Sequence, residues 1–167
     1  MAVVYYLIAL IVFLVDQGAK YLIATRLELA EEIPVIGNFF LITSHRNTGA
    51  AFGILPNQRW FFIVITIVVV VAIIWYMNRV RKSSSRKLLP VALSLVLGGA
   101  IGNFLDRALN GEVVDFLQFN FGSYTFPIFN VADSCIVIGV ALIILDSLMD
   151  MNRTESNNKS NEGNEPV

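Results

Sequence analysis

The sequence predicts an all-α membrane protein with four transmembrane helices and a small β-rich extracytoplasmic subdomain. Of its 167 residues, 56% are hydrophobic and only 15% are charged, whereas soluble domains have about a quarter of their residues charged. Four apolar segments are each close to the length of about 20 residues that a helix needs to cross a bilayer. The connection after the first segment contains short runs that are typical of strands.

The predicted transmembrane helices cover, in order, residues 3–23, 60–77, 88–105 and 127–149. The second is the clearest, because no charged residue interrupts it between Arg59 and Arg79 and no polar stripe marks it as a soluble core helix. Residues 1–6 lack the positive charge that begins a secretory signal. We therefore expect the first helix to be retained in the mature protein.

The distribution of lysine and arginine predicts the orientation of these helices. Five such residues fall between positions 79 and 87, after the second helix, whereas the segment 105–126 contains only Arg107. By the positive-inside rule, residues 79–87 lie in the cytoplasm. Four spans then place both termini in the cytoplasm and the two loops, 24–59 and 106–126, outside.

The first outer loop contains two β-prone runs, residues 33–36 and 39–43, separated by the turn signal Gly37-Asn38. We expect these runs to form a small sheet that lies on the outer surface of the bilayer. Residues 1–152 are expected to form one membrane domain. Residues 153–167 are too polar to bury a core, so we expect a disordered cytoplasmic tail there.

Charge and composition exclude two classes of site. A net charge of −1 provides no basic surface for a nucleic acid. The chain has one cysteine, Cys135, and one histidine, His45, so it cannot build a metal cluster from these two residue types. A metal site would have to consist of carboxylates alone.

Ionisable residues inside a membrane segment are costly, so each is a candidate for function. Asp16 and Lys20 lie one turn apart on the same face of the first helix, a spacing that fits a structural ion pair as well as a functional role. In the third helix, Asn103 and Arg107 share a stripe. These two side chains could hydrogen-bond a peptide backbone. The arginine could equally extend its charged group to the membrane interface, a structural role known as snorkelling.

Asp115 and Asp133 are both predicted at the outer membrane boundary, each in an apolar stretch and only 18 residues apart (133 − 115). Two carboxyl groups that meet there cannot both ionise cheaply, so one keeps its proton. The charged acid can then take a proton from water while the neutral one donates to a peptide carbonyl. The spacing alone does not show that they meet, because Asn130 and Asp133 also fit an N-cap and a first-turn acid.

The residues alone leave several functions open. A serine intramembrane protease would need a helix-borne serine and a histidine base, but His45 lies in a loop and no G-x-S-x-G sequence occurs. A small ion or proton transporter would also bury aspartate and arginine, although its charges would gather near the midplane. A non-catalytic membrane subunit would not explain the clustered outer acids. Peptidase and transporter are equally compatible with these residues.

Five segments resemble, in order, the motifs of lipoprotein signal peptidase (signal peptidase II). They are Asp16-Gln17-Gly18-Ala19-Lys20, the run from His45 to Gly53 (HRNTGAAFG), the run from Gly102 to Arg107 (GNFLDR), Val113-Val114-Asp115-Phe116, and the run from Phe129 to Ser134 (FNVADS). The resemblance extends over residues 5–150. Ala19 departs from it, because the family usually has threonine there.

This resemblance implies an intramembrane aspartyl endopeptidase that removes the signal peptide from diacylglyceryl-modified bacterial prolipoproteins, cutting before the lipidated cysteine. It implies a monomer in the cytoplasmic membrane that contacts lipid, acts at the outer face and uses no metal or cofactor. The implied catalytic pair is Asp115 and Asp133. The positions implied around the substrate are Asn47, Gly49, Asn103, Arg107, Asn130 and Ala132, and the supporting positions are Asp16, Lys20 and Asp106. With this resemblance the peptidase is preferred, and a small ion or proton transporter is the alternative.

Overall fold

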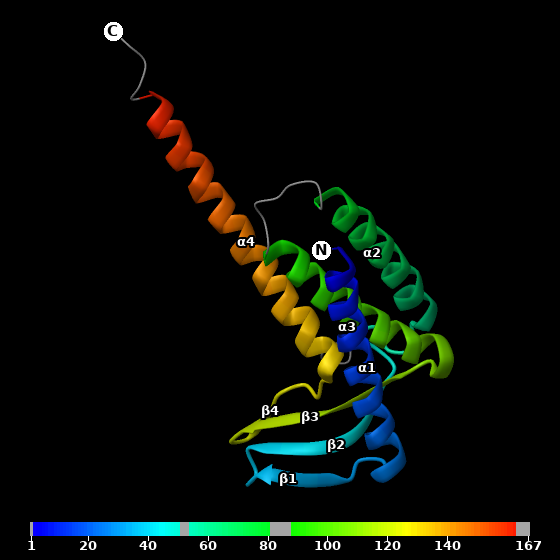
Figure 1. Ribbon diagram of the computed structural model, residues 1–167. Helices are drawn as coiled ribbons and strands as arrows, with labels where there is room; N and C mark the ends of the chain where they lie inside the picture. Colours follow the sequence, from blue (N-terminus) through cyan, green and yellow to red (C-terminus); the bar gives the residue numbers. More distant parts are fainter. Residues whose placement is uncertain (1, 51–53, 81–87, 163–167) are drawn as a thin grey trace.

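The computed structural model describes residues 2–50, 54–80 and 88–162. Their elements, in chain order, are α1 (Ala2–Arg26), β1 (Glu32–Ile36), β2 (Phe40–Asn47), α2 (Arg59–Val80), α3 (Leu88–Asn110), β3 (Val113–Phe121), β4 (Tyr124–Thr125) and α4 (Val131–Glu162). Figure 1 shows the helices gathered at one end of the molecule and the sheet at the other. Most of the basic segment 79–87 lies outside the described residues.

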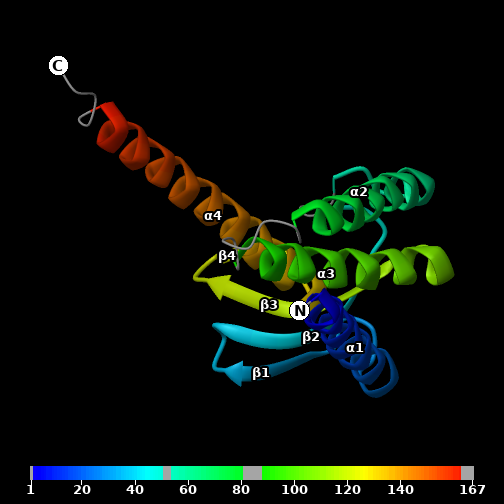
Figure 2. The same ribbon diagram turned by 45° about the horizontal axis from the view of Figure 1, so that its top comes forward.

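All four predicted transmembrane helices are confirmed. Four helices are long and apolar enough to cross a membrane: Val3–Arg26, Arg59–Arg79, Leu88–Asn110 and Val131–Asn152. The third is the central helix, because it packs against α1, α2 and α4 (Figure 2) and has the largest buried share of the four. The others expose many large apolar side chains, which is the surface that a helix presents to lipid.

Glycines on α3 allow its neighbours to approach closely. A Cβ atom at Gly98 would lie 2.5 Å from the carbonyl oxygen of Ala9 on α1, and one at Gly99 would lie 2.5 Å from the carbonyl oxygen of Ala132 on α4. Neither position can accept a larger side chain unless a helix moves. In a bilayer the hydrophobic effect does not drive helices together, so close packing at small residues is a main source of their association. These glycines therefore let α1 and α4 pack directly against the backbone of α3.

The sheet has four strands in the order β1-β2-β3-β4, and each neighbouring pair is antiparallel. The predicted β1–β2 hairpin is confirmed, and Gly37 takes the positive φ of 49° in its turn. β3 was not predicted, since residues 106–126 were treated as a loop. Its first four residues are all buried, so the alternation that identifies a half-exposed strand is missing there.

Three predicted boundaries are corrected by the structure. α3 continues to Asn110, beyond the predicted end at 105. α4 starts at Val131 and not at 127, because the backbone of Phe129 pairs with Leu117 of β3 and so cannot be helical. α4 also continues to Glu162, where a disordered tail from 153 was predicted. Extending an existing helix costs far less than starting one, so polar residues can prolong it.

Candidate active site

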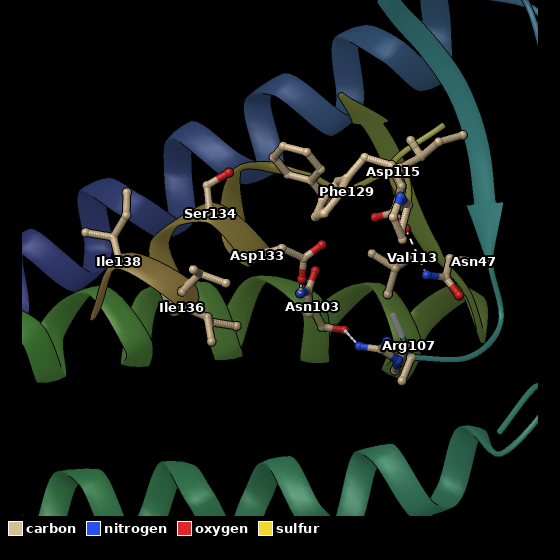
Figure 3. A pocket seen from close by; sticks show the side chains of 15 residues that line it. Asn47, Asn103, Arg107, Val113, Asp115, Phe129, Asp133, Ser134, Ile136 and Ile138 are labelled. Atoms are coloured by element: carbon tan, nitrogen blue, oxygen red, sulfur yellow. Dashed lines mark hydrogen bonds between the residues drawn. The ribbon is translucent and has the colours of Figure 1, made fainter. Parts of the chain in front are cut away.

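Asp115 and Asp133 line the same cavity, of about 520 Å³, although they come from different elements. Asp115 lies on β3, and Asp133 lies in the first turn of α4 (Figure 3). Asn47, Asn103, Arg107 and Ser134 complete the polar part of the wall, and residues 126–129 and 136–138 form much of the apolar part. We call this the aspartate cavity. The structure therefore brings together the two acids that the sequence left unconnected.

Asp115 is buried, with 1% of its surface exposed. Its Oδ2 accepts a hydrogen bond from Asn47 Nδ2 at 2.9 Å, and its Oδ1 accepts one from Asn130 Nδ2 at 2.7 Å. Burial raises the pKa of Asp115 to about 7, and the charge of Asp133 raises it too. The two amide hydrogen bonds and the charge of Lys20 act in the opposite direction but do not offset the burial. Asp115 therefore exchanges its proton near neutral pH.

Asp133 both caps α4 and faces the cavity. Its backbone N–H donates to Asn130 Oδ1 at 2.9 Å, and the backbone N–H of Asn130 donates to Asp133 Oδ2 at 3.3 Å, which is a capping box. The other oxygen, Oδ1, accepts a hydrogen bond from Asn103 Nδ2 at 2.7 Å. The capping interpretation and the active-site interpretation of Asp133, which the sequence presented as alternatives, are thus compatible.

Lys20 is the centre of a buried cluster of polar side chains that lies behind the cavity. Its Nζ lies 2.8 Å from Asp16 Oδ2, 2.8 Å from Asp106 Oδ2 and 2.8 Å from Asn103 Oδ1. Because the oxygen of Asn103 accepts from Lys20, the amide nitrogen of Asn103 is turned toward Asp133. The ammonium group of Lys20 is thus linked to Asp133 through the side chain of Asn103.

Asp16 fixes the start of α4. Its Oδ1 accepts a hydrogen bond from the backbone N–H of Ala132 at 2.8 Å, so a carboxylate from α1 satisfies one of the unpaired amides in the first turn of α4. A Cβ atom at Gly102 would lie 2.5 Å from Asp16 Oδ2, so a larger residue there would displace the Asp16 carboxylate. The position of Asp133 therefore depends on a contact between α1 and α4.

Arg107 lines the cavity and connects α3 to the segment after β2 and to α2. Its Nη2 donates to the carbonyl oxygen of Gly49 at 2.8 Å, and its guanidinium lies 4.7 Å from the centre of the Phe62 ring on α2. The backbone N–H of Gly49 donates to Asn47 Oδ1 at 2.9 Å. Residues 51–53 of the same predicted motif lie outside the described residues.

The predicted substrate-contacting residues divide into two groups. Asn47, Asn103 and Arg107 line the cavity. Gly49 and Asn130 do not line it but hydrogen-bond to Arg107 and Asp115, which do. Ala132 does not line it either, and its backbone N–H donates to Asp16 behind the cavity. Ala132 has no exposed surface and packs in the contact between α3 and α4.

The apolar wall was missed by the sequence analysis. Residues 127–129 and 136–138 were assigned to the fourth helix and residue 126 to the loop before it. The signal that could have separated them is the capping pair Asn130 and Asp133, which fits a helix that begins after Asn130. Among the described residues, no group of three or more His, Cys, Asp or Glu side chains could hold a metal ion.

Comparison with known proteins gives consistent matches over most of the chain. Residues 8–149 match the protein family described as signal peptidase (SPase) II. The chain is 51% identical over 151 residues to a lipoprotein signal peptidase of Bacillus pumilus (strain SAFR-032), covering 90% of this chain and 96% of that protein. It is 56% identical over 146 residues to a lipoprotein signal peptidase of Brevibacillus brevis (strain 47), covering 87% of this chain and 95% of that protein.

Solved structures agree with the fold. A bacterial membrane enzyme determined by the in meso method at 2.3 Å resolution superposes with a TM-score of 0.81 and 43% identity, covering 98% of this chain and 94% of that one. A second bacterial membrane enzyme, at 1.9 Å resolution, gives a TM-score of 0.78 and 46% identity, covering 88% of this chain and 94% of that one. Both similarities extend over the helices and the sheet together.

Proposed function

This chain belongs to the signal peptidase II family, and on that premise we propose that it is an aspartyl endopeptidase that works within the membrane. Its substrates are diacylglyceryl-modified prolipoproteins, and it cuts before the lipidated cysteine to release the signal peptide. The observation that carries the proposal is the shared cavity of Asp115 and Asp133, in which one buried and one partly buried carboxyl group lie together with an apolar wall.

The two acids take opposite protonation states in this mechanism. Asp133 lies in the first turn of α4, where the helix dipole stabilises a negative charge, and it accepts the Asn103 amide. Asp115 lies on a strand, has no helix end to stabilise a charge, and has its pKa raised by burial to about 7. Asp133 is therefore the charged base and Asp115 the protonated acid.

Hydrolysis proceeds in two proton-balanced steps. A water oxygen attacks the peptide carbonyl carbon while Asp133 accepts a proton from the water and Asp115 donates its proton to the carbonyl oxygen. The resulting gem-diol returns a proton to Asp115, the C–N bond breaks, and Asp133 gives its proton to the leaving amine. Both acids then regain their starting states. The Asn47, Asn103 and Asn130 amides keep the carboxyl groups oriented throughout.

The apolar wall fits a substrate that enters from lipid. Val137 and Ile138 line the aspartate cavity and are also 68% and 52% exposed, within a helix that is apolar enough to cross a membrane. An exposed side chain at that depth contacts lipid, so the cavity opens sideways toward the bilayer. Acyl chains and an apolar signal peptide can reach the two acids by this route without passing through water.

The buried charges do not suit an ion transporter. Asp16, Asp106, Asp115 and Asp133 belong to one connected network, joined through Lys20 and the amides of Asn103 and Asn130. A transporter would place its ionisable groups around the midplane, along a path from one side to the other. This network ends at the aspartate cavity, beside the sheet.

The proposal is tested with purified enzyme and one prolipoprotein prepared with and without its diacylglyceryl group. The lipid is remote from the cleaved bond but anchors the substrate, so its loss should reduce the rate as well as the affinity. We expect cleavage before the cysteine of the lipidated form and little cleavage of the other. Equal rates on both substrates would contradict the lipid requirement and indicate a more general intramembrane protease.

A further inference from the structure

A second cavity, of about 330 Å³, adjoins the aspartate cavity on the side of the sheet. It is lined by His45, Asn47, Tyr124, Thr125, Phe126, Pro127 and Ile128. Asn47 and Phe126–Ile128 also line the aspartate cavity, so the two cavities share a wall. We call the second one the sheet-side cavity.

The two cavities differ in where their remaining walls come from. The residues found only in the aspartate cavity include Ile136–Ile138 of α4, which belong to a membrane-spanning segment. The residues found only in the sheet-side cavity are His45 of β2 and Tyr124 and Thr125 of β4, all outside the four spans. One cavity therefore extends along a membrane-spanning segment, and the other extends along strands outside the spans.

Asn47 marks the passage between them. Its Nδ2 donates to Asp115 Oδ2 at 2.9 Å, and His45 lies opposite Asp115 in the register of β2 and β3. A peptide that runs from one cavity into the other therefore passes Asn47, which is hydrogen-bonded to Asp115. An extended chain advances about 3.3 Å per residue, so the next few residues beyond the cleaved bond would lie in the sheet-side cavity.

We infer that the sheet-side cavity binds the first residues of the mature chain, which follow the lipidated cysteine, and that His45 and Tyr124 contact them. This inference rests on the proposed function. In that substrate the signal peptide and the acyl chains are apolar and belong on the lipid side. The mature chain is the part that must end in water, and a cavity with imidazole, phenol, hydroxyl and amide groups suits the polar backbone of an extended peptide.

Contacts there should govern binding more than chemistry. His45 and Tyr124 lie outside the hydrogen-bond network of the two acids, so removing them leaves the acid–base pair intact. A lost hydrogen bond or packing contact corresponds to a rise in KM of about three- to tenfold, with kcat changed less than about twofold. That rise should occur only with substrates that have residues to place in the cavity.

The experiment crosses enzyme variants with two lipidated substrates. The long substrate continues for several residues beyond the lipidated cysteine, and the short substrate ends at that cysteine as an amide. The variants are His45→Ala, Tyr124→Ala and the milder Tyr124→Phe. The matched control is Phe121→Ala, because Phe121 pairs with Tyr124 across the β3–β4 hairpin and is similarly exposed, at 57% against 54%, but does not line the cavity.

We expect His45→Ala and Tyr124→Ala to raise KM for the long substrate and to leave KM for the short substrate unchanged, while Phe121→Ala changes neither. Equal changes on both substrates, or no change with the long one, would overturn the inference while the proposed function stood. If the wild type cleaved neither lipidated substrate, the proposed function itself would fail, and this inference with it. Thermal melting of each variant separates a binding effect from unfolding.

Discussion

Four carboxylate oxygens, two on Asp115 and two on Asp133, each accept a hydrogen bond from an amide N–H group. An asparagine at either position would place its own NH2 group against one of these donors. The change from aspartate to asparagine therefore removes titration and also creates a donor–donor contact, unless a neighbouring amide turns over. Measurements on such variants need a stability control for this reason.

The pKa of Asp115 predicts how activity depends on pH. In the proposed mechanism Asp115 must hold a proton, and its pKa is raised to about 7 mainly by burial. Below that pKa the acid is protonated, and above it the acid is charged, so kcat/KM should fall as the pH rises above about 7. The measurement is kcat/KM for the lipidated precursor from about pH 5 to about pH 9.

Unfolding can be separated from this effect. The pKa of Asp115 is higher in the folded protein than in an unfolded chain, where it is about 3.9. Its contribution to stability is thus complete below about pH 4 and is lost as the pH rises through about 7, with little further change above that. Melting temperatures should therefore stay level while the rate falls. A rate that stayed constant to about pH 9 would contradict Asp115 as the proton donor.

At the scale of elements, the junction of α1, α3 and α4 fixes where the acids lie. Lys20 is 2% exposed and is the cation beside the carboxylates of Asp16 and Asp106. Removing it leaves two buried carboxylates unpaired, and breaking a buried ion pair in this way costs about 3–5 kcal/mol.

We predict that Lys20→Met lowers the free energy of unfolding by about this amount, about 3–5 kcal/mol, in denaturation experiments in detergent. Arg26→Met is the matched control, because Arg26 lies on the same helix and is exposed; its effect should be within about 0.5 kcal/mol. Equal stability of the Lys20→Met variant and the wild type would show that the cluster does not hold these helices together.

The sequence predicted some elements well because their signal is local. Continuous apolarity identified the four membrane helices, and the turn at Gly37-Asn38 identified the β1–β2 hairpin. β3 and the start of α4 depend on contacts made only in the folded chain. The backbone of Phe129 bonds to Leu117, twelve residues away (129 − 117), and this pairing overrides the apolar pattern that suggested a helix from 127.

The candidate site was predictable in part. Asp115 and Asp133 could be named, because an acid in an apolar stretch at a membrane boundary is unusual. Their meeting could not be derived, because it requires β3 to pair with β2 and α4 to start at Val131, capped by Asn130. The exposure of Val137 and Ile138 beside the cavity could not be predicted either, because it depends on which face of α4 remains uncovered by α3.

At the scale of the whole molecule, the ends of the helices divide into two groups. The sheet lies at the end where α3 finishes, and α2 ends and α3 begins at the opposite end (Figure 1). We propose that residues 1–152 form the membrane peptidase domain and that both termini are cytoplasmic, with the site at the outer face.

The orientation can be measured directly. A reporter fused after Val167 should be accessible only from the cytoplasm, because the lysines and arginines of residues 79–87 favour the inner side and four spans place both termini together. A second reporter placed in the β3–β4 turn, at Ser123, is the control and should be accessible only from outside. The opposite pattern would put the cavity on the cytoplasmic face and contradict the proposed access to exported precursors.

The central claim is that Asp115 and Asp133 act as one catalytic unit, and the most direct test is kcat for the lipidated precursor with Asp115→Asn, Asp133→Asn and the double variant. Asp106→Asn is the control, since Asp106 pairs with Lys20 behind the cavity and does not line it. Each single change should reduce kcat by about 10²- to 10⁴-fold, the double variant should be little worse, and Asp106→Asn should lose less. Near-normal turnover of Asp133→Asn alongside an inactive but folded Asp106→Asn would contradict the account and place Asp106 in the pair.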